Sequence, residues 1–456
     1  MGVWNVIFAS QMNVKSRIDS DYFLPEYVVN ERKLDEIETK KLTEIFFVSD
    51  GNHLEISRHF YDDNKMVPYY RGKDINDFFI ENANPVRIPN HIYNLGIMKR
   101  SHFKAGDVLL SIVGTIGSLS VVPNTLGDAT GSCKIAILRK KGTYSPFLLA
   151  AFLLSKYGQS QIKRNTRGAV QMGLILKDFV NIRVPVFKAE IMTEIEGMVT
   201  EAIEINNLSK TLYAQAQEIL EKELGLDELK IIKNKTYESS FSEVIEAGRS
   251  DADYYQTHFR AIADHIKTIQ TQPLSQIAYL LKGIEVGSLS YTDEGKLFIR
   301  VSNVKKSAII TGNSDKYISE GLFSTLKIYQ PNVGDILLTK DGTLGECYVV
   351  DQEMEGIISG GIMKLILKNS SIPAEYLSLV INSKICKLQI ERVCSGAIIL
   401  HWKPRDIASL RIPILDNGIM TKLADLVTSS KLAKRESEML LENAKKRIEN
   451  LIEGMI

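Results

Sequence analysis

The sequence of 456 residues is poor in the features that mark secreted and metal-binding proteins. Its four cysteines form no C-x-x-C pair and have no histidine at ligand spacing, so neither a disulfide framework nor a zinc knuckle is expected. The first ten residues lack a basic segment and a small-residue cleavage site. We therefore expect a chain that begins near Met1 and works in the reducing cytoplasm.

A hydrophobic run long enough to span a membrane is also lacking. Residues 108–127 carry no charge, but half of them are Gly, Ser, Thr, Pro or Asn, which favours strands and turns. We expect no contact with a membrane.

Motifs of common enzymes are missing as well. The sequence has no GxxxxGK[ST] phosphate loop, no HExxH, no GxSxG and no [DN]PP[YFW] of an amino-methyltransferase. Seven histidines do not cluster, and no metal site is expected. Two acidic pairs, Asp19 with Asp21 and Asp251 with Asp253, are the alternative: they could hold Mg²⁺ in a nuclease. Carboxylates beside an arginine more often orient the start of a chain, which we favour.

Neither sign of charge dominates, since 56 Lys and Arg face 55 Asp and Glu. The segment 188–232 has four basic and ten acidic residues, and the segment 416–456 has seven of each. The rest of the chain therefore carries the basic surplus, +7, and this is where a polyanion would bind.

The most informative feature of the sequence is an internal repeat. Blocks of the first half recur in the second half at an offset of 232 residues near the start, 229 at the second pair, and 228 or 229 from Gly106 onward. Such drift is typical of small loop insertions. The matched blocks are 17–22 with 249–254, 70–75 with 299–304, 106–117 with 334–345, and 178–186 with 406–414. In addition, 130–131 falls near 359–360, and 167–169 near 395–397.

Within each copy the pattern predicts a mixed α/β globule. Residues 106–122 and 334–350 indicate two short strands joined by a Gly-Thr-x-Gly turn, in which Asp107 and Asp335 bond neighbouring backbone amides. A hairpin turn explains the glycines without a ligand, although a phosphate cradle is the alternative. Residues 146–162 and 373–390 are apolar at helical spacing. The RVPV and RIPI segments predict strands that end at a proline.

A long helix follows each globule. Apolar residues step mostly by three or four from Ile195 to Leu224 and again from Leu423 to Ile452, with polar breaks near Ser430 and Ser437. A narrow stripe sustained for about thirty residues favours a coiled-coil seam, whereas two ordinary helices packed on their own globules are the alternative. We expect four parts: globules at 1–187 and 233–415, and helical regions at 188–232 and 416–456.

The ordered set of these motifs, present twice, resembles the specificity subunit of type I restriction-modification systems over essentially the whole chain. The resemblance implies two target recognition domains, each reading one half of a bipartite double-stranded DNA site. It implies an antiparallel coiled coil of the two helices with a pseudo-twofold relation between the halves. It also implies docking of two methyltransferase subunits, and of restriction subunits in the full complex. The chain itself would be non-catalytic and hold no cofactor, whereas S-adenosylmethionine, ATP and Mg²⁺ would belong to the partners.

Candidate DNA contacts are polar and basic residues where the two copies differ. Arginine can pair with guanine, asparagine or glutamine with adenine, and lysine mostly with phosphate. In the first copy they are Tyr70, Arg71, Lys73, Arg100, Lys134, Arg164, Asn165, Arg167 and Gln171. In the second copy they are Arg300, Ser302, Asn303, Lys305, Lys306, Lys340, Arg392, Ser395, His401 and Lys403. Each could instead be solvated surface, and the matched Arg71 and Arg300 could equally be structural ion-pair partners.

The helices offer a candidate surface for the methyltransferase subunits, flanked by Glu194, Glu201, Lys434 and Lys445. A specificity subunit of a type IIB-like system, a stand-alone Mg²⁺-dependent nuclease and a scaffold without a DNA role remain as alternatives.

Overall fold

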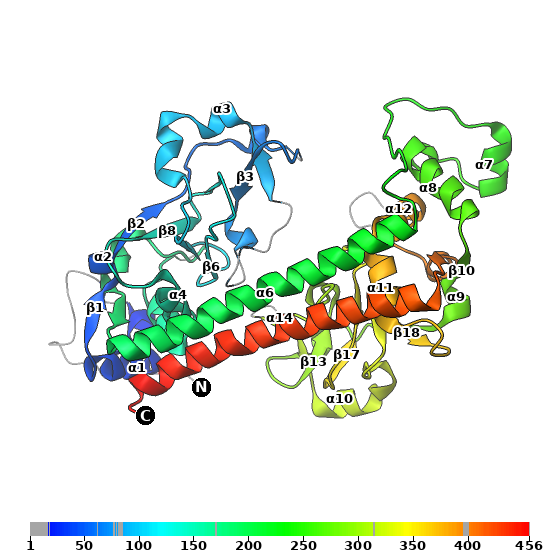
Figure 1. Cartoon of the computed structure of the whole chain (residues 1–456). Helices are drawn as coiled ribbons and strands as arrows, with labels where there is room; N and C mark the ends of the chain where they lie inside the picture. The colour runs from blue at the N-terminus through cyan, green and yellow to red at the C-terminus, as the bar shows by residue number, and fades with distance from the viewer. Residues whose placement is uncertain are drawn as a thin grey trace. The chain divides into compact units, whose positions relative to one another are not determined.

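The computed structural model describes residues 17, 19–61, 63–75, 78, 80, 85–168, 171–312, 315–394 and 401–455. The chain divides into two compact units, one made of residues up to 205 together with 435–456, the other of 206–434. Each unit holds one globule and half of each of two long helices, α6 (Ala189–Glu223) and α14 (Asn417–Ile452), drawn in green and red in Figure 1. The predicted fold class, a mixed α and β chain with tandem globules and two long helices, is confirmed.

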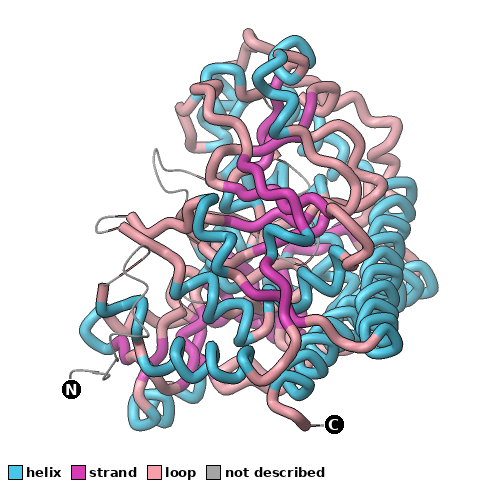
Figure 2. Tube along the Cα trace, turned by 90° about the vertical axis from the view of Figure 1, so that its left-hand side faces the viewer, coloured by secondary structure: helices cyan, strands magenta, loops and turns pink. Residues whose placement is uncertain are grey.

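The first globule contains three small sheets and five α-helices among the described residues. The sheets have the strand orders β2-β8-β5-β6, β4-β3-β7 and β1-β9. The strands are β1 (Thr39–Lys41), β2 (Phe46–Asp50), β3 (Val67–Tyr70), β4 (Val86–Ile88), β5 (Val108–Ser111), β6 (Leu119–Val121), β7 (Thr130–Gly131), β8 (Ile135–Lys140) and β9 (Arg183–Pro185). The helices are α1 (Pro25–Asp35), α2 (Leu42–Ile45), α3 (Asn90–Tyr93), α4 (Pro146–Leu154) and α5 (Lys156–Arg164). Short helices and long loops surround the strands (Figure 2).

The second globule repeats this plan. Its sheets have the orders β11-β18-β15-β16, β12-β14-β13-β17 and β10-β19. The strands are β10 (Thr271–Pro273), β11 (Ala278–Lys282), β12 (Tyr291–Thr292), β13 (Lys296–Ile299), β14 (Tyr317–Ile318), β15 (Ile336–Thr339), β16 (Cys347–Val349), β17 (Gly356–Ile358), β18 (Ile362–Leu367) and β19 (Arg411–Pro413). The helices are α7 (Phe241–Ala247), α8 (Thr257–Thr268), α9 (Leu274–Ile277), α10 (Glu320–Thr325), α11 (Ala374–Asn382), α12 (Lys384–Val393) and α13 (Pro404–Ala408).

The strand ladders confirm the repeat and refine its offset. Thr39 pairs with Pro185 in the β1–β9 ladder, and Thr271 pairs with Pro413 in the β10–β19 ladder. The predicted offsets are therefore correct for these strands: 232 residues from Thr39 to Thr271, and 228 residues from Pro185 to Pro413. The approximate match of 130–131 near 359–360 is refined by two residues. Strands β7 and β17 occupy equivalent places, with Gly131 opposite Tyr70 and Ile358 opposite Ile299, so residues 130–131 correspond to 357–358.

The predicted hairpins are confirmed. Strand β5 pairs antiparallel with β6, and β15 pairs antiparallel with β16. The glycines of both Gly-Thr-x-Gly turns have positive φ, for example +91° at Gly117 and +71° at Gly345, which side chains with a Cβ rarely adopt. Gly117 and Gly345 also donate backbone hydrogen bonds within their own hairpins, to the carbonyls of Ser111 and Thr339. The turn geometry thus accounts for the repeated glycines.

The aspartate before each hairpin is buried and bonds the backbone, as predicted. Asp107 accepts hydrogen bonds from the amide of Lys104 (2.7 Å) and from the guanidinium of Arg139 (2.8 and 2.6 Å). Asp335 accepts one from the amide of Asn332 (2.8 Å), and its second partner is Lys364 at 3.5 Å.

We expect Asp107→Ala to lower the free energy of unfolding of the first unit by about 3 kcal/mol, because it removes three hydrogen bonds and leaves a half-buried guanidinium without its carboxylate. Urea unfolding followed by circular dichroism measures this change. The control is Asp35→Ala, which removes an exposed ion pair with Arg183 and should cost at most about 1 kcal/mol. Equal losses in the two variants would contradict the prediction.

Each predicted helix near residues 146–162 and 373–390 is a pair of helices. The break falls at Ser155 in one globule and at Ser383 in the other, where the backbone is extended. Ser155 then caps the next helix, since its hydroxyl accepts a hydrogen bond from the amide of Gly158 (3.3 Å). The hydroxyl of Ser383 donates to the carbonyl of Val380 (2.6 Å).

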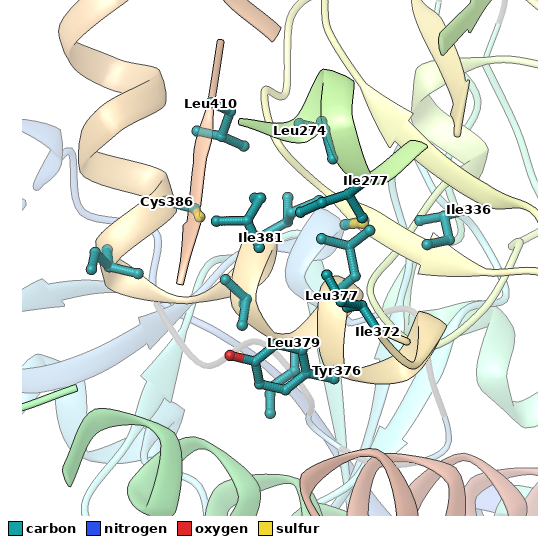
Figure 3. Packing of buried hydrophobic residues seen from close by; sticks show 14 of the residues in the cluster. Leu274, Ile277, Ile336, Ile372, Tyr376, Leu377, Leu379, Ile381, Cys386 and Leu410 are labelled. Carbon is teal, nitrogen blue, oxygen red and sulfur yellow. The ribbon is translucent and has the colours of Figure 1, made fainter. Parts of the chain in front are cut away.

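A hydrophobic core in each unit joins the sheet to the helical pair and to the long helices. In the second unit, side chains from α9, α11, α12 and β15 pack together, as Figure 3 shows for Leu274, Leu377, Cys386 and Ile336. Helices α6 and α14 contribute Ala216, Leu220, Leu423 and Val427 to this cluster. The long helices are therefore part of the globular cores as well as partners of each other.

The two long helices pack antiparallel within each unit. In the first unit the early part of α6 lies against the late part of α14, and the hydroxyl of Ser437 donates to the carbonyl of Ala202 (2.6 Å). In the second unit the late part of α6 lies against the early part of α14, and the hydroxyls of Ser209 and Ser430 each donate to the carbonyl oxygen of the other residue (2.7 and 2.8 Å). The serines that interrupt the apolar pattern are thus buried and hydrogen-bonded in the seam. Within the described ranges, no helix combines the length and the hydropathy that crossing a bilayer would need.

Candidate nucleic-acid interface

The R-x-D-x-D-Y motif closes the start of each globule onto its helical pair. In the first globule Arg17 binds Asp19 and donates to the carbonyl of Thr166 (2.6 Å), while the guanidinium groups of Arg17 and Arg164 lie 5.1 and 4.2 Å from the centre of the Tyr22 ring. The hydrogen bond from Arg17 holds the pKa of Asp19 below its ordinary value. The carboxylate of Asp19 therefore forms an ion pair with Arg17.

The second globule contains the same arrangement. Arg249 binds Asp251 and donates to the carbonyl of Val393 (2.9 Å), and Arg392 lies 4.2 Å from the centre of the Tyr254 ring. The hydrogen bond from Arg249 lowers the pKa of Asp251. Among the described residues, no three His, Cys, Asp or Glu side chains are grouped so that they could hold a metal ion. The first aspartate of each acidic pair, Asp19 or Asp251, therefore binds the arginine two residues before it, as the motif predicts.

Four segments meet at one place in the first globule. A Cβ on Gly72 would lie 3.4 Å from the carbonyl oxygen of Val113 and 3.6 Å from the Cβ of Lys134. Gly173 forms β-bridges with both Val113 and Arg167. The segments around residues 72, 113, 134 and 173 thus form one surface at the turn end of the β5–β6 hairpin.

The corresponding segments meet in the second globule. The amide of Lys340 donates to the carbonyl of Gly361 (2.9 Å), and the amide of Trp402 donates to the carbonyl of Lys340 (2.9 Å). A Cβ on Gly361 would contact the side chain of Val301 at 2.7 Å. Two equivalent surfaces, one on each globule, therefore collect most of the candidate residues.

Some candidates are buried and have structural partners. Asn165 and Asn303 are 2% and 3% exposed and bond their own globules, Asn165 through Gln161 and Asn181, and Asn303 through Ile310 and Asp315. The other buried candidates are Tyr70 in the core beside β3, Arg164 in the tyrosine stack and Lys340 paired with Asp341. Because these five side chains are buried, their polar groups are not available to a bound molecule.

A second group of candidates is partly or fully exposed and already bonded to other residues of the protein. Arg167 pairs with Asp178 through two hydrogen bonds (2.8 and 2.6 Å), Arg71 with Asp74 (2.9 Å), and Arg100 with Asp50 (3.0 Å). In the second copy, Arg392 stacks on a tyrosine, His401 bonds Asp341 (2.7 Å), and Arg300 is half-buried, with its amide donating to Asn303. The matched arginines differ in their neighbours: Asp74 faces Arg71, whereas Asn303 faces Arg300.

The remaining candidates are exposed. They are Lys73, Lys134, Gln171, Ser302, Lys305, Lys306 and Lys403. Ser395 lies outside the described residues. The sequence reasoning missed Ser111 and Thr339, which are fully buried at equivalent strand ends beneath the two surfaces. Ser111 bonds Thr115 (3.0 Å), and Thr339 accepts from the amide of Glu346 (2.9 Å). A hydroxyl at the end of each apolar strand is the signal that could have identified them.

Comparisons with known proteins give structural matches only. No family model matches the sequence, and no curated protein matches it. Among solved structures, the chain is similar to the type I restriction-modification S subunit from M. genitalium, with 12% identity, a TM-score of 0.39, and coverage of 92% of this chain and 96% of that one. It is also similar to the HsdS subunit from Thermoanaerobacter tengcongensis, with 14% identity, a TM-score of 0.29, and coverage of 92% and 97%. A third match, described as the complex assembly and conformational transition of the type I restriction-modification system, has 13% identity, a TM-score of 0.30, and coverage of 92% and 98%.

Proposed function

We propose that this protein is the DNA-specificity subunit of a type I restriction-modification complex. Each globule reads one half of an asymmetric bipartite site, and the two long helices set the spacing and dock two methyltransferase subunits. Restriction subunits complete the assembly. The chain acts in the cytoplasm as a reader, and adenine methylation and ATP-dependent cleavage belong to the partner subunits.

The observation that carries this proposal is a pair of equivalent surfaces with different side chains. Arg71 faces Asp74 on the first surface, whereas Arg300 has Asn303 at the matched position on the second. Lys134 of the first surface corresponds to Gly361 of the second. Two similar surfaces with unlike contact groups suit two unlike half-sites, since base edges are read by the type and place of each donor and acceptor.

Exposed lysines supply the part of binding that does not depend on sequence. Lys73 and Lys134 belong to the first surface, and Lys305 and Lys306 come shortly after Arg300 of the second surface. Lysine side chains contact phosphates, whose neutralisation releases counterions and contributes much of the affinity. Arginine and glutamine at the surfaces, including Gln171, are the candidates for base contacts.

The half-sites are tested with the reconstituted complex of this chain and its methyltransferase partners. Arg71→Ala and Arg300→Ala are each expected to weaken discrimination at one half-site only, by about 1–3 kcal/mol, because each removes a base contact from one globule. Binding to DNA libraries randomised in one half-site at a time measures the effect. The control is Lys384→Ala, an exposed lysine at the start of α12 that lies outside both surfaces.

Three outcomes would contradict the proposal. Equal loss on every DNA sequence would place the arginines on phosphates or in the fold, which a melting curve separates. Binding that is independent of sequence, or no binding, would favour a scaffold. Cleavage of plasmid by the purified chain with Mg²⁺ would favour a nuclease. A specificity subunit of a type IIB-like system is the close alternative, distinguished by a neighbouring gene that fuses methylation and cleavage in one partner chain.

A further inference from the structure

The second globule contains a pocket with a volume of about 340 Å³ beside α8 and α12. These two helices contact each other, and the start of β19 and the end of α13 complete the wall. Its apolar lining includes Phe259, Ile262, Ile266, Leu388 and Leu410. A cavity of this size is at the lower end of those that hold small molecules.

In the first globule, polar side chains occupy the equivalent positions and bond one another. The repeat equates Ile262 with Asn30 and Leu388 with Ser160, and the Asn30 amide donates to the Ser160 hydroxyl (2.8 Å). Two further contacts of the first globule have no counterpart in the second. Asn181 donates to Asn165 (3.1 Å), and the equivalent residues of the second globule are Ser409 and Val393. Arg164 pairs with Glu31 (2.8 Å), and the equivalent residues are Arg392 and Ala263. The second globule thus has an apolar pocket where the first has a hydrogen-bonded cluster.

One residue of the pocket wall has a buried polar atom without a partner. Trp402 lines the pocket and is 1% exposed, and no described residue accepts a hydrogen bond from its indole Nε1. The repeat equates Trp402 with the apolar Leu174 of the first globule. A buried donor without an acceptor costs free energy, which a ligand oxygen in the pocket would recover.

The charges around the pocket favour an anion. Lys267, Arg392 and Arg411 line it against one acidic side chain, Asp406. Lys267 is paired with the carboxylate of Asp264, whereas Arg392 and Arg411 bond uncharged oxygens of Tyr254 and Thr271, so the two arginines raise the potential at the pocket. An oxygen that carries negative charge therefore suits the position near Trp402 better than a neutral one.

We propose that this pocket binds a small apolar molecule that carries a carboxylate. The apolar part lies among Ile262, Ile266 and Leu388, and a carboxylate oxygen accepts the indole hydrogen of Trp402. This site is a property of the second globule alone and does not depend on a role in DNA recognition.

Octanoate is a suitable probe, and Trp402 can report its binding. Trp4 and Trp402 are the two tryptophans of the chain, so Trp4→Phe in the full-length protein leaves Trp402 as the sole indole fluorophore. We expect a saturable change of its fluorescence with octanoate and one site per chain in equilibrium dialysis. Butanoate, which keeps the carboxylate but fills little of the pocket, should bind at least about tenfold more weakly because it buries less apolar surface. Equal affinity for the two acids, or no saturable binding of octanoate, would overturn the proposal.

Two variants test the location by dialysis. Ile262→Asn combined with Leu388→Ser introduces the polar pair of the first globule and should reduce octanoate binding at least about tenfold. Trp402→Phe keeps an aromatic ring but removes the donor, and should weaken octanoate binding about fivefold or more. The control Leu289→Ser removes a fully exposed leucine of the same unit and should leave binding unchanged. Normal binding by a folded Trp402→Phe protein and by the double variant would overturn the assignment, with folding checked by thermal melting.

Discussion

Ala216→Asp is expected to lower the free energy of unfolding of the second unit by about 3–5 kcal/mol. Ala216 lies in α6 and is fully buried in the core cluster that contains Leu423 and Val427 of α14. A carboxylate there has apolar neighbours from the helix seam and the globule, and it would lose its hydration without gaining a partner. Thermal and urea unfolding followed by circular dichroism measure the change. In the proposed function, capture of a methyltransferase partner should fall in parallel, because the seam orders the helical surface.

Ala214→Asp is the matched control for this change. Ala214 lies on the same helix two residues earlier and is exposed, so both variants carry the same change in helix propensity and charge. We expect the control to alter stability by about 0.5 kcal/mol or less beyond that shared propensity difference. The difference between the two variants should shrink at acidic pH, where the introduced carboxyl group is neutral. Equal effects would show that the seam at Ala216 is open to water.

Gly51→Ala is expected to destabilise the first globule by about 2–4 kcal/mol. Gly51 follows β2, and a Cβ there would overlap the carbonyl oxygens of Gly131 and Ser132. The backbone at this point joins two sheets, since the amide of Asn52 donates to the carbonyl of Gly131 (2.7 Å) and the amide of Ser132 to that of Tyr70 (2.9 Å). Backbone atoms held by these bonds cannot move aside as a flexible side chain would. In the proposed function, recognition of one half-site should then fail before that of the other.

Gly142→Ala is the control for the first globule, because a Cβ on Gly142 would meet no atom within 4 Å. A third variant uses the repeat: Gly283 occupies the equivalent place in the second globule, where a Cβ would overlap the carbonyl oxygens of Ile358 and Ser359. Gly283→Ala should therefore destabilise the second unit by a similar amount. Chemical unfolding resolves the two units if their transitions separate. Full stability in both glycine variants would contradict the close approach.

The candidate surfaces were only partly predictable from the sequence. The sequence indicated segments that the structure brings together, because a loop flanked by a matched strand and a glycine turn is visible in each copy. The exposure of single residues could not be predicted from the sequence, because it depends on contacts across the globule. Asn165 and Lys73 are both polar residues of candidate loops, but Asn165 is buried by bonds to Gln161 and Asn181, whereas Lys73 is exposed.

The sequence by itself determined the duplication, the hairpins with their glycine turns and the positions of the long helices, because each of these is written in local spacing of residues along the chain. Only the tertiary structure decided how the seam serines are used and which arginines are held by carboxylates or stacked on Tyr22 and Tyr254. The same holds for the pocket beside Trp402, since Asn30 meets Ser160, and Ile262 approaches Leu388, only when helices more than a hundred residues apart are packed together. Such contacts depend on packing between distant segments, which local periodicity does not encode.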